Sequence, residues 1–140
     1  MLNLNDPIIP GESAAGVRLG QLVEGIIAAV QPLTTIPLPG SVKVCFESVN
    51  LWVKGNRVTQ IGVIGNYQGK LSGTIGIGST IRDIQNAFGP VVEDEEDNLT
   101  VPSMAGWCFE TEPWRDSHKL EDNLDACVTE IFVYAIHAAR

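Results

Sequence analysis

The sequence predicts an α+β fold: a mostly antiparallel sheet with two short helices packed on one face. Three observations predict it. Apolar and polar residues alternate through the middle of the chain, two short stretches have helical spacing, and the turns between candidate strands are short. The length of 140 residues suits one domain, residues 1–140, and a hydrophobic content of 44% suits a folded core.

The first helix is expected within residues 20–30. Leu22 and Ile26 lie on one face at helical spacing, together with Ala29 and Val30. Pro32 ends this helix. The proline-containing stretch that follows, residues 33–40, is expected to be a loop.

Strands are expected next, at residues 42–46, 49–54 and 57–64. In the first two, valine, leucine and phenylalanine alternate with polar or bulky residues. Gly55 and Asn56 both tolerate a positive φ, so they predict a two-residue hairpin turn between the second and third of these strands.

A strand at residues 75–77 is expected to lead into the second helix. Ser79 or Thr80 can cap the helix start, and Asp83 lies in the first turn, where the helix dipole favours an anion. Gly89 and the proline after it predict the helix end. Later strands are expected at residues 99–101, 107–111 and 127–136.

A weak internal repeat is visible. Residues 16–26 align with residues 74–84 without a gap, which matches Gly20 with Gly78 and leaves a proline at the same offset in each copy. The pattern is consistent with a duplicated helix-plus-sheet unit, or with two unrelated joints between a strand and a helix.

Composition and spacing argue against several functions. The formal charge of −8 disfavours nucleic acid and anionic membranes as partners and favours a basic protein. The first residues lack a secretory signal and the three cysteines are widely spaced, so we expect a cytoplasmic protein. The glycine-rich segment matches neither phosphate-binding fingerprint, and no cysteine or histidine pair has zinc-site spacing. We therefore expect no cofactor and no metal.

One catalytic alternative stays open. Cys108 lies ten residues before His118, so a small hydrolase or a ligand-binding domain could use this pair. Buried free cysteine is the common structural explanation for such a residue.

Protein binding is the better-supported hypothesis. Five consecutive acidic residues can steer a cationic partner, and the tryptophans that follow can anchor it by burial. Alternatively, the acids are only solvated, and Trp107 belongs to the core. The candidate partner-binding residues are Glu93, Asp94, Glu95, Glu96, Asp97, Trp107 and Trp114.

Three segments of the chain carry a family resemblance. They are residues 8–20 (IIPGESAAGVRLG), residues 61–90 (IGVIGNYQGKLSGTIGIGSTIRDIQNAFGP) and residues 92–110 (VEDEEDNLTVPSMAGWCFE). They resemble small bacterial immunity proteins of contact-dependent growth inhibition and polymorphic toxin systems. The unit of glycine, helix and proline is also similar to the repeat of β-lactamase-inhibitor-protein-like domains. The resemblance implies a non-enzymatic inhibitor that neutralises a cognate toxin domain, here a basic nuclease, in the cytoplasm. It implies no shared catalytic residues.

Overall fold

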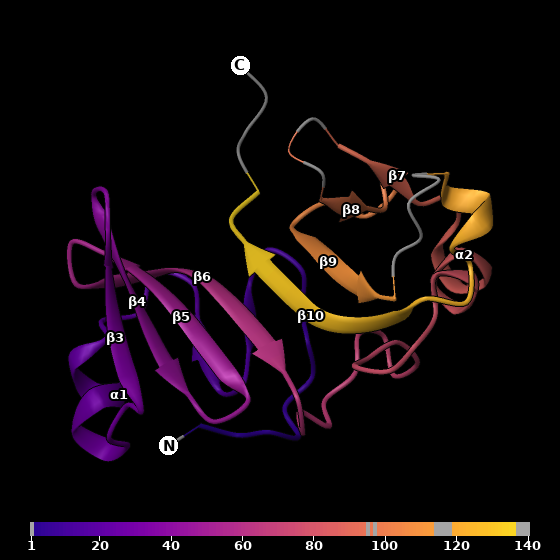
Figure 1. The fold of residues 1–140 in the computed structure, drawn as a ribbon. Coiled ribbons are helices and arrows are strands. Elements are labelled where there is room, and N and C mark those ends of the chain that lie inside the picture. Colours follow the sequence, from indigo (N-terminus) through magenta and orange to yellow (C-terminus); the bar gives the residue numbers. More distant parts are fainter. Residues whose placement is uncertain (1, 95, 97, 114–118, 137–140) are drawn as a thin grey trace.

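The computed structural model describes residues 2–94, 96, 98–113 and 119–136 (Figure 1). Within these residues an eight-stranded antiparallel sheet has the order β3-β4-β5-β6-β10-β9-β8-β7, and a separate two-stranded sheet pairs β1 with β2. The expected class, a mostly antiparallel sheet with two helices, is therefore confirmed. The strands are β1 Ser13–Ala14, β2 Val17–Arg18, β3 Thr34–Leu38, β4 Ser41–Phe46, β5 Val49–Lys54, β6 Arg57–Ile64, β7 Val92–Glu93, β8 Leu99–Thr100, β9 Trp107–Glu112 and β10 Cys127–Tyr134.

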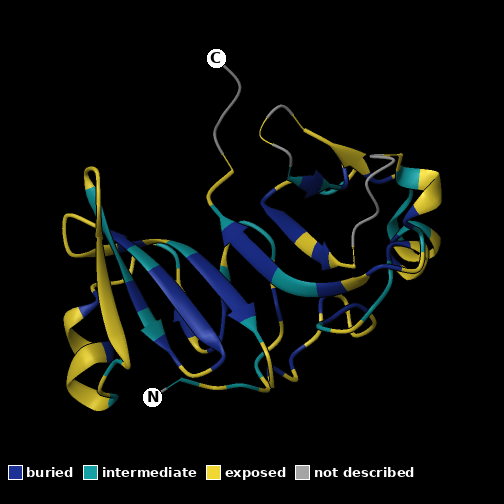
Figure 2. Cartoon of the chain, viewed as in Figure 1, coloured by how far each residue is buried: buried dark blue, intermediate teal, exposed yellow. Residues whose placement is uncertain are grey.

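The core lies against one face of the large sheet. Side chains alternate between the two faces of each strand, and the cross-strand register aligns the buried ones in rows. The strands that carry most of these residues, β5, β6, β9 and β10, form the buried centre of the molecule, whereas β3 is exposed along its whole length (Figure 2). One fully buried row consists of Val49, Val63, Ile131, Phe109 and Leu99.

The predicted hairpin is confirmed. β5 pairs with β6, and the turn between them places Gly55 and Asn56 at φ of 56° and 63°. Both values lie in the left-handed region, which these two residue types adopt at low cost.

The second predicted helix is also confirmed. It is α2, Ile81–Phe88, and a capping box starts it. The Thr80 hydroxyl accepts a hydrogen bond from the Asp83 backbone N–H at 3.1 Å, and the Asp83 carboxylate accepts one from the Thr80 N–H at 3.0 Å. Two of the helix's free amides are thereby satisfied. The helix ends at Gly89, whose φ is 101°.

The first helix is shorter than expected. It is α1, Glu24–Ala29, because the backbone before it bonds to β6 instead of continuing the helix. A 3₁₀ turn, η1, spans Leu120–Asp122. None of the helices in the described ranges is both long and apolar enough to cross a membrane.

Two local expectations were wrong. Residues 33–40 contain the edge strand β3, since Pro37 lies at a sheet edge, where a missing N–H costs no ladder bond. Residues 75–77 form no strand; Ile75 makes only an isolated bridge with Leu71. Ile75 is buried, so its packing into the core explains the apolar side chain at this position without a strand.

The two halves of the chain make equivalent joints to the sheet. Gly20 N–H donates to Val58 O, and Val58 N–H donates to Gln21 O. Gly78 and Ser79, which lie 58 positions after Gly20 and Gln21, make the same pair of bonds with β10: Gly78 N–H donates to Val128 O, and Val128 N–H donates to Ser79 O. These are the positions that the sequence alignment matched. The sheet order is likewise symmetric, with β6 and β10, the last strand of each half, paired at its centre.

Candidate functional site

The sheet face opposite the core carries a mixture of aromatic, acidic and amide side chains. We call it the polar face, and its register follows from the strand pairing. One row runs from Trp52 through Gln60 to Tyr134, and the next runs from Gly62 through Phe132 to Cys108. A third row pairs Glu130 with Glu110. The central strands thus bring together residues that are up to 82 positions apart in the chain, Trp52 and Tyr134.

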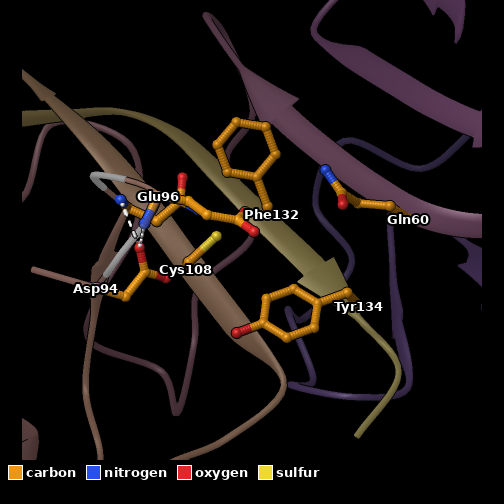
Figure 3. A pocket seen from close by; sticks show the side chains of 7 residues that line it. Gln60, Asp94, Glu96, Cys108, Phe132 and Tyr134 are labelled. Carbon is orange, nitrogen blue, oxygen red and sulfur yellow. Dashed lines mark hydrogen bonds between the residues drawn. The ribbon is translucent and has the colours of Figure 1, made fainter. Parts of the chain in front are cut away.

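A hollow of about 530 Å³ lies on this face (Figure 3). Phe132 and Cys108 are 9% and 8% exposed and form its floor, while residues of β6, β10 and the β7–β8 turn surround them. In Figure 3 the side chains of Glu96, Tyr134 and Gln60 stand around this floor. The lining residues are Gln60, Asp94, Glu96, Asn98, Cys108, Phe132 and Tyr134.

Asp94 and Glu96 lie between β7 and β8, at the tip of the hairpin that these strands form. Asp94 N–H donates to Asn98 O at 2.9 Å, which closes the turn. The Asp94 carboxylate oxygen Oδ1 accepts hydrogen bonds from the backbone N–H groups of Glu96 and Asn98, both at 2.9 Å. Asp94 therefore has a structural role in addition to its charge. An aspartate can do this because its short side chain reaches backbone amides two residues ahead.

Four carboxylates act on the Cys108 thiol. Burial raises the pKa of Cys108 to about 12, and the negative charges of Asp94, Glu110, Glu130 and Glu96 add to the rise. The four carboxylates together make this part of the polar face strongly negative. Tyr134, beside Cys108, has a raised pKa mainly because of burial, and Asp94 contributes there as well.

Glu130 lies within the polar face and is half-buried. Burial has the largest effect on its carboxyl and raises the pKa. A hydrogen bond with the Asn50 side chain lowers this pKa, the negative charge of Glu110 raises it, and the positive charge of Lys43 lowers it. In the described part of the chain, its buried Oε2 atom has no hydrogen-bond partner. A glycine at position 62 leaves room for this carboxylate, since an added Cβ would lie 2.6 Å from Oε2.

The aromatic side chains of the polar face contact one another. Trp52 and Phe132 pack edge to face with ring centroids 5.8 Å apart, and the Lys43 ammonium lies 5.1 Å from the Trp52 ring centre. The Tyr134 hydroxyl donates a hydrogen bond to Trp107 O at 3.3 Å. These contacts fix the positions of the aromatic rings.

The residues predicted from the sequence have different outcomes. Glu93, Asp94 and Glu96 are exposed, and two of them reach the hollow. Trp107 is only 1% exposed, and its ring stacks on that of Phe109 with ring centroids 5.3 Å apart. The expectation that Trp107 anchors a partner is therefore corrected, because it is a core residue. Glu95, Asp97 and Trp114 lie outside the described residues, as does His118.

Sequence reasoning missed Gln60, Phe132 and Tyr134. The signal that could have found them is the period-2 alternation within β6 and β10, which places these three on the face opposite Ile61, Val63, Ile131 and Val133. Their convergence on Cys108 could not be found this way, because it depends on which strands are neighbours.

The described residues contain no group of three or more His, Cys, Asp or Glu side chains arranged to hold a metal ion. Comparison with protein-family models gave no match, and neither curated proteins nor solved structures gave a significant one. The geometry of the polar face is thus the structural observation that bears on function.

We expect Cys108 to resist alkylation by iodoacetamide at neutral pH. The thiolate is the reactive form, and a pKa raised from 9.0 to about 12 lowers its fraction by at least ~100-fold. The exposed Cys127 is the internal control and should be modified under the same conditions. Peptide mass spectrometry distinguishes the two sites. Rapid modification of Cys108 in the folded protein would revive the nucleophile hypothesis.

Proposed function

We propose that this protein is an immunity protein that binds and neutralises a cognate toxin domain, a basic nuclease, in the cytoplasm. The observation that supports it best is the polar face of the sheet. Two carboxylates, those of Asp94 and Glu96, line a hollow there beside fixed aromatic rings, and the charges of Glu110 and Glu130 also act on Cys108 at its floor. Aromatic residues supply contact area, and negative charge speeds encounter with a cationic protein.

The net charge of −8 adds to this argument. A basic nuclease domain must attract nucleic acid, so its substrate-binding surface is positive. An acidic inhibitor competes for that surface or binds beside it. The similarity to immunity proteins favours such an inhibitor over a general adaptor.

The proposal requires that the polar face be free. We propose that α1 and α2 belong to two copies of one duplicated unit and cover the same face, the one that carries the core. Ile26 of α1 and Ile84 of α2 belong to the same buried cluster as Leu51 and Ile131 of the sheet, which supports this arrangement. The equivalent joints at Gly20 and Gly78 support the duplication.

The test is a pull-down with the product of the neighbouring toxin gene, followed by a growth-protection assay. Co-purification of the two proteins and survival of cells that express both are the expected results. Cells that remain sensitive to the toxin while the inhibitor is folded and abundant would overturn the proposal. Turnover of a small substrate by the purified protein would overturn it as well.

We expect the triple substitution Glu93→Lys, Glu95→Lys and Asp97→Lys to slow association with the toxin domain, most strongly at low salt. Reversing three charges weakens long-range attraction, and salt screens that attraction beyond roughly 10 Å at 0.1 M. Stopped-flow or surface plasmon resonance measures the association rate. Substituting Glu12, Glu24 and Glu121 by Lys changes the net charge equally and serves as the control. Equal rates for the two triple variants would refute steering by the hairpin tip.

A further inference from the structure

We propose that the hollow on the polar face receives one cationic side chain of the partner protein, an arginine. Its aliphatic part would lie against Phe132 and Tyr134, and its guanidinium would meet Asp94 and Glu96. This inference rests on the proposed function, because it names the chemical group by which a basic partner is held.

The shape of the hollow fits a long side chain. Its volume of about 530 Å³ far exceeds the roughly 30 Å³ share of one water molecule. The floor is apolar or weakly polar, since it consists of Phe132 and Cys108. Two carboxylates stand at the rim on the hairpin tip, with the Gln60 amide on the opposite strand (Figure 3). An arginine has the same division, an apolar stem and a charged planar head.

The charge of the hollow favours a cation. Asp94 and Glu96 line it directly, and among the residues that the structure describes no Lys or Arg lines it. The electrostatic effect of Glu110 and Glu130 also reaches Cys108, at its floor. A single salt bridge, Arg82 to Asp125 at 3.4 Å, is present among the described residues, and neither of its members lines the hollow. The carboxylates at the rim are thus available to a partner's cation.

Other occupants suit the hollow less well. Sites for small organic ligands are mostly apolar and bury the ligand, whereas four of these seven lining residues carry a carboxylate or an amide. A metal ion would need several converging ligands, and the described residues contain no such group. Arginine is favoured over lysine because its planar head can bind two acceptors and stack on an aromatic ring.

The first test changes the charge inside the hollow in both directions. We expect Gln60→Lys to weaken toxin binding by at least about tenfold, because the new ammonium would occupy the site and repel the arginine. Gln60→Glu should strengthen binding or leave it unchanged. Gln68→Lys is the matched control, since Gln68 is exposed, does not line the hollow and adds the same charge. Isothermal titration calorimetry gives the dissociation constants.

A third variant removes a negative charge from the hollow and complements the two Gln60 substitutions. Asp94→Asn keeps the Oδ1 acceptor that holds the hairpin turn and removes the negative charge. We expect it to weaken binding by roughly three- to tenfold, with the melting temperature retained. If Gln60→Lys and Gln68→Lys bind the toxin equally well, the arginine site is wrong and the proposed function stands.

The second test does not need the toxin. L-argininamide is titrated into ¹⁵N-labelled protein, with L-citrullinamide, whose side chain is isosteric but uncharged, as the control. We expect argininamide to shift the amide signals of Gln60, Cys108 and Tyr134, and Gln60→Lys to abolish these shifts. Equal shifts with both compounds, or none with argininamide, would overturn the inference. Selective shifts without toxin binding would instead keep the site and reject the proposed partner.

Discussion

Replacing Phe109 by alanine should destabilise the protein by about 3–5 kcal/mol, a large fraction of the roughly 5–15 kcal/mol that holds a domain of this kind folded. Phe109 is fully buried at the centre of β9, and its ring stacks on Trp107 at an interplanar angle of 24°. Removal of the ring leaves a cavity that the flanking strands cannot fill. Urea denaturation followed by tryptophan fluorescence measures the change in the free energy of unfolding.

Phe88→Ala is the matched control for that substitution. Phe88 is in α2, half-buried, and packs edge to face with Trp107, with ring centroids 6.2 Å apart. The same atoms are removed, but from a position where water can enter. We expect a loss of roughly half that of Phe109→Ala. Equal losses would show that burial in β9 does not determine the cost.

The second large effect is expected at Gly106. Its φ is 96°, and a Cβ at this position would lie 2.5 Å from the backbone nitrogen of Gly11. The two backbones touch because Gly11 N–H donates to Gly106 O at 3.0 Å. Gly106→Ala must separate them, so we expect a loss of at least ~3 kcal/mol from backbone strain and steric overlap together.

Gly40→Ala separates these two contributions. Gly40 also has a positive φ, 74°, but no atom lies within 4 Å of the position a Cβ would occupy. Its substitution should cost only about 1–2 kcal/mol, the strain of a left-handed residue. Thermal unfolding of both variants gives the comparison. A Gly106→Ala protein as stable as Gly40→Ala would show that the contact with Gly11 can relax.

Local signals in the sequence predicted much of the fold. The Gly55-Asn56 turn, the Thr80 cap and the β-branched run of β10 each depend on residues close together in the chain, and each was found. β3 was missed because Pro37 is a breaker in the interior of a sheet but is tolerated at its edge. Whether a strand lies at an edge depends on the whole topology.

The candidate site was predicted less completely. The acids at the hairpin tip were visible as a charge run, and the structure places Asp94 and Glu96 at the hollow. Trp107 was a candidate both for a partner anchor and for the core, because the sequence alone does not reveal which side chains of β9 are buried; the structure places it in the core. Phe132 and Gln60 come together only because β10 pairs with β6, a contact between distant segments that no local pattern encodes.

The central position of β10 has a consequence for shortened forms of the protein. Its two neighbours, β6 and β9, bond to it and not to each other. A chain cleaved before Cys127 would therefore lose the strand that joins β6 to β9. These two strands would then expose unpaired amides and carbonyls. Such edges template association between molecules. Proteolytic fragments lacking β10 should accumulate as aggregates instead of persisting as smaller folded proteins.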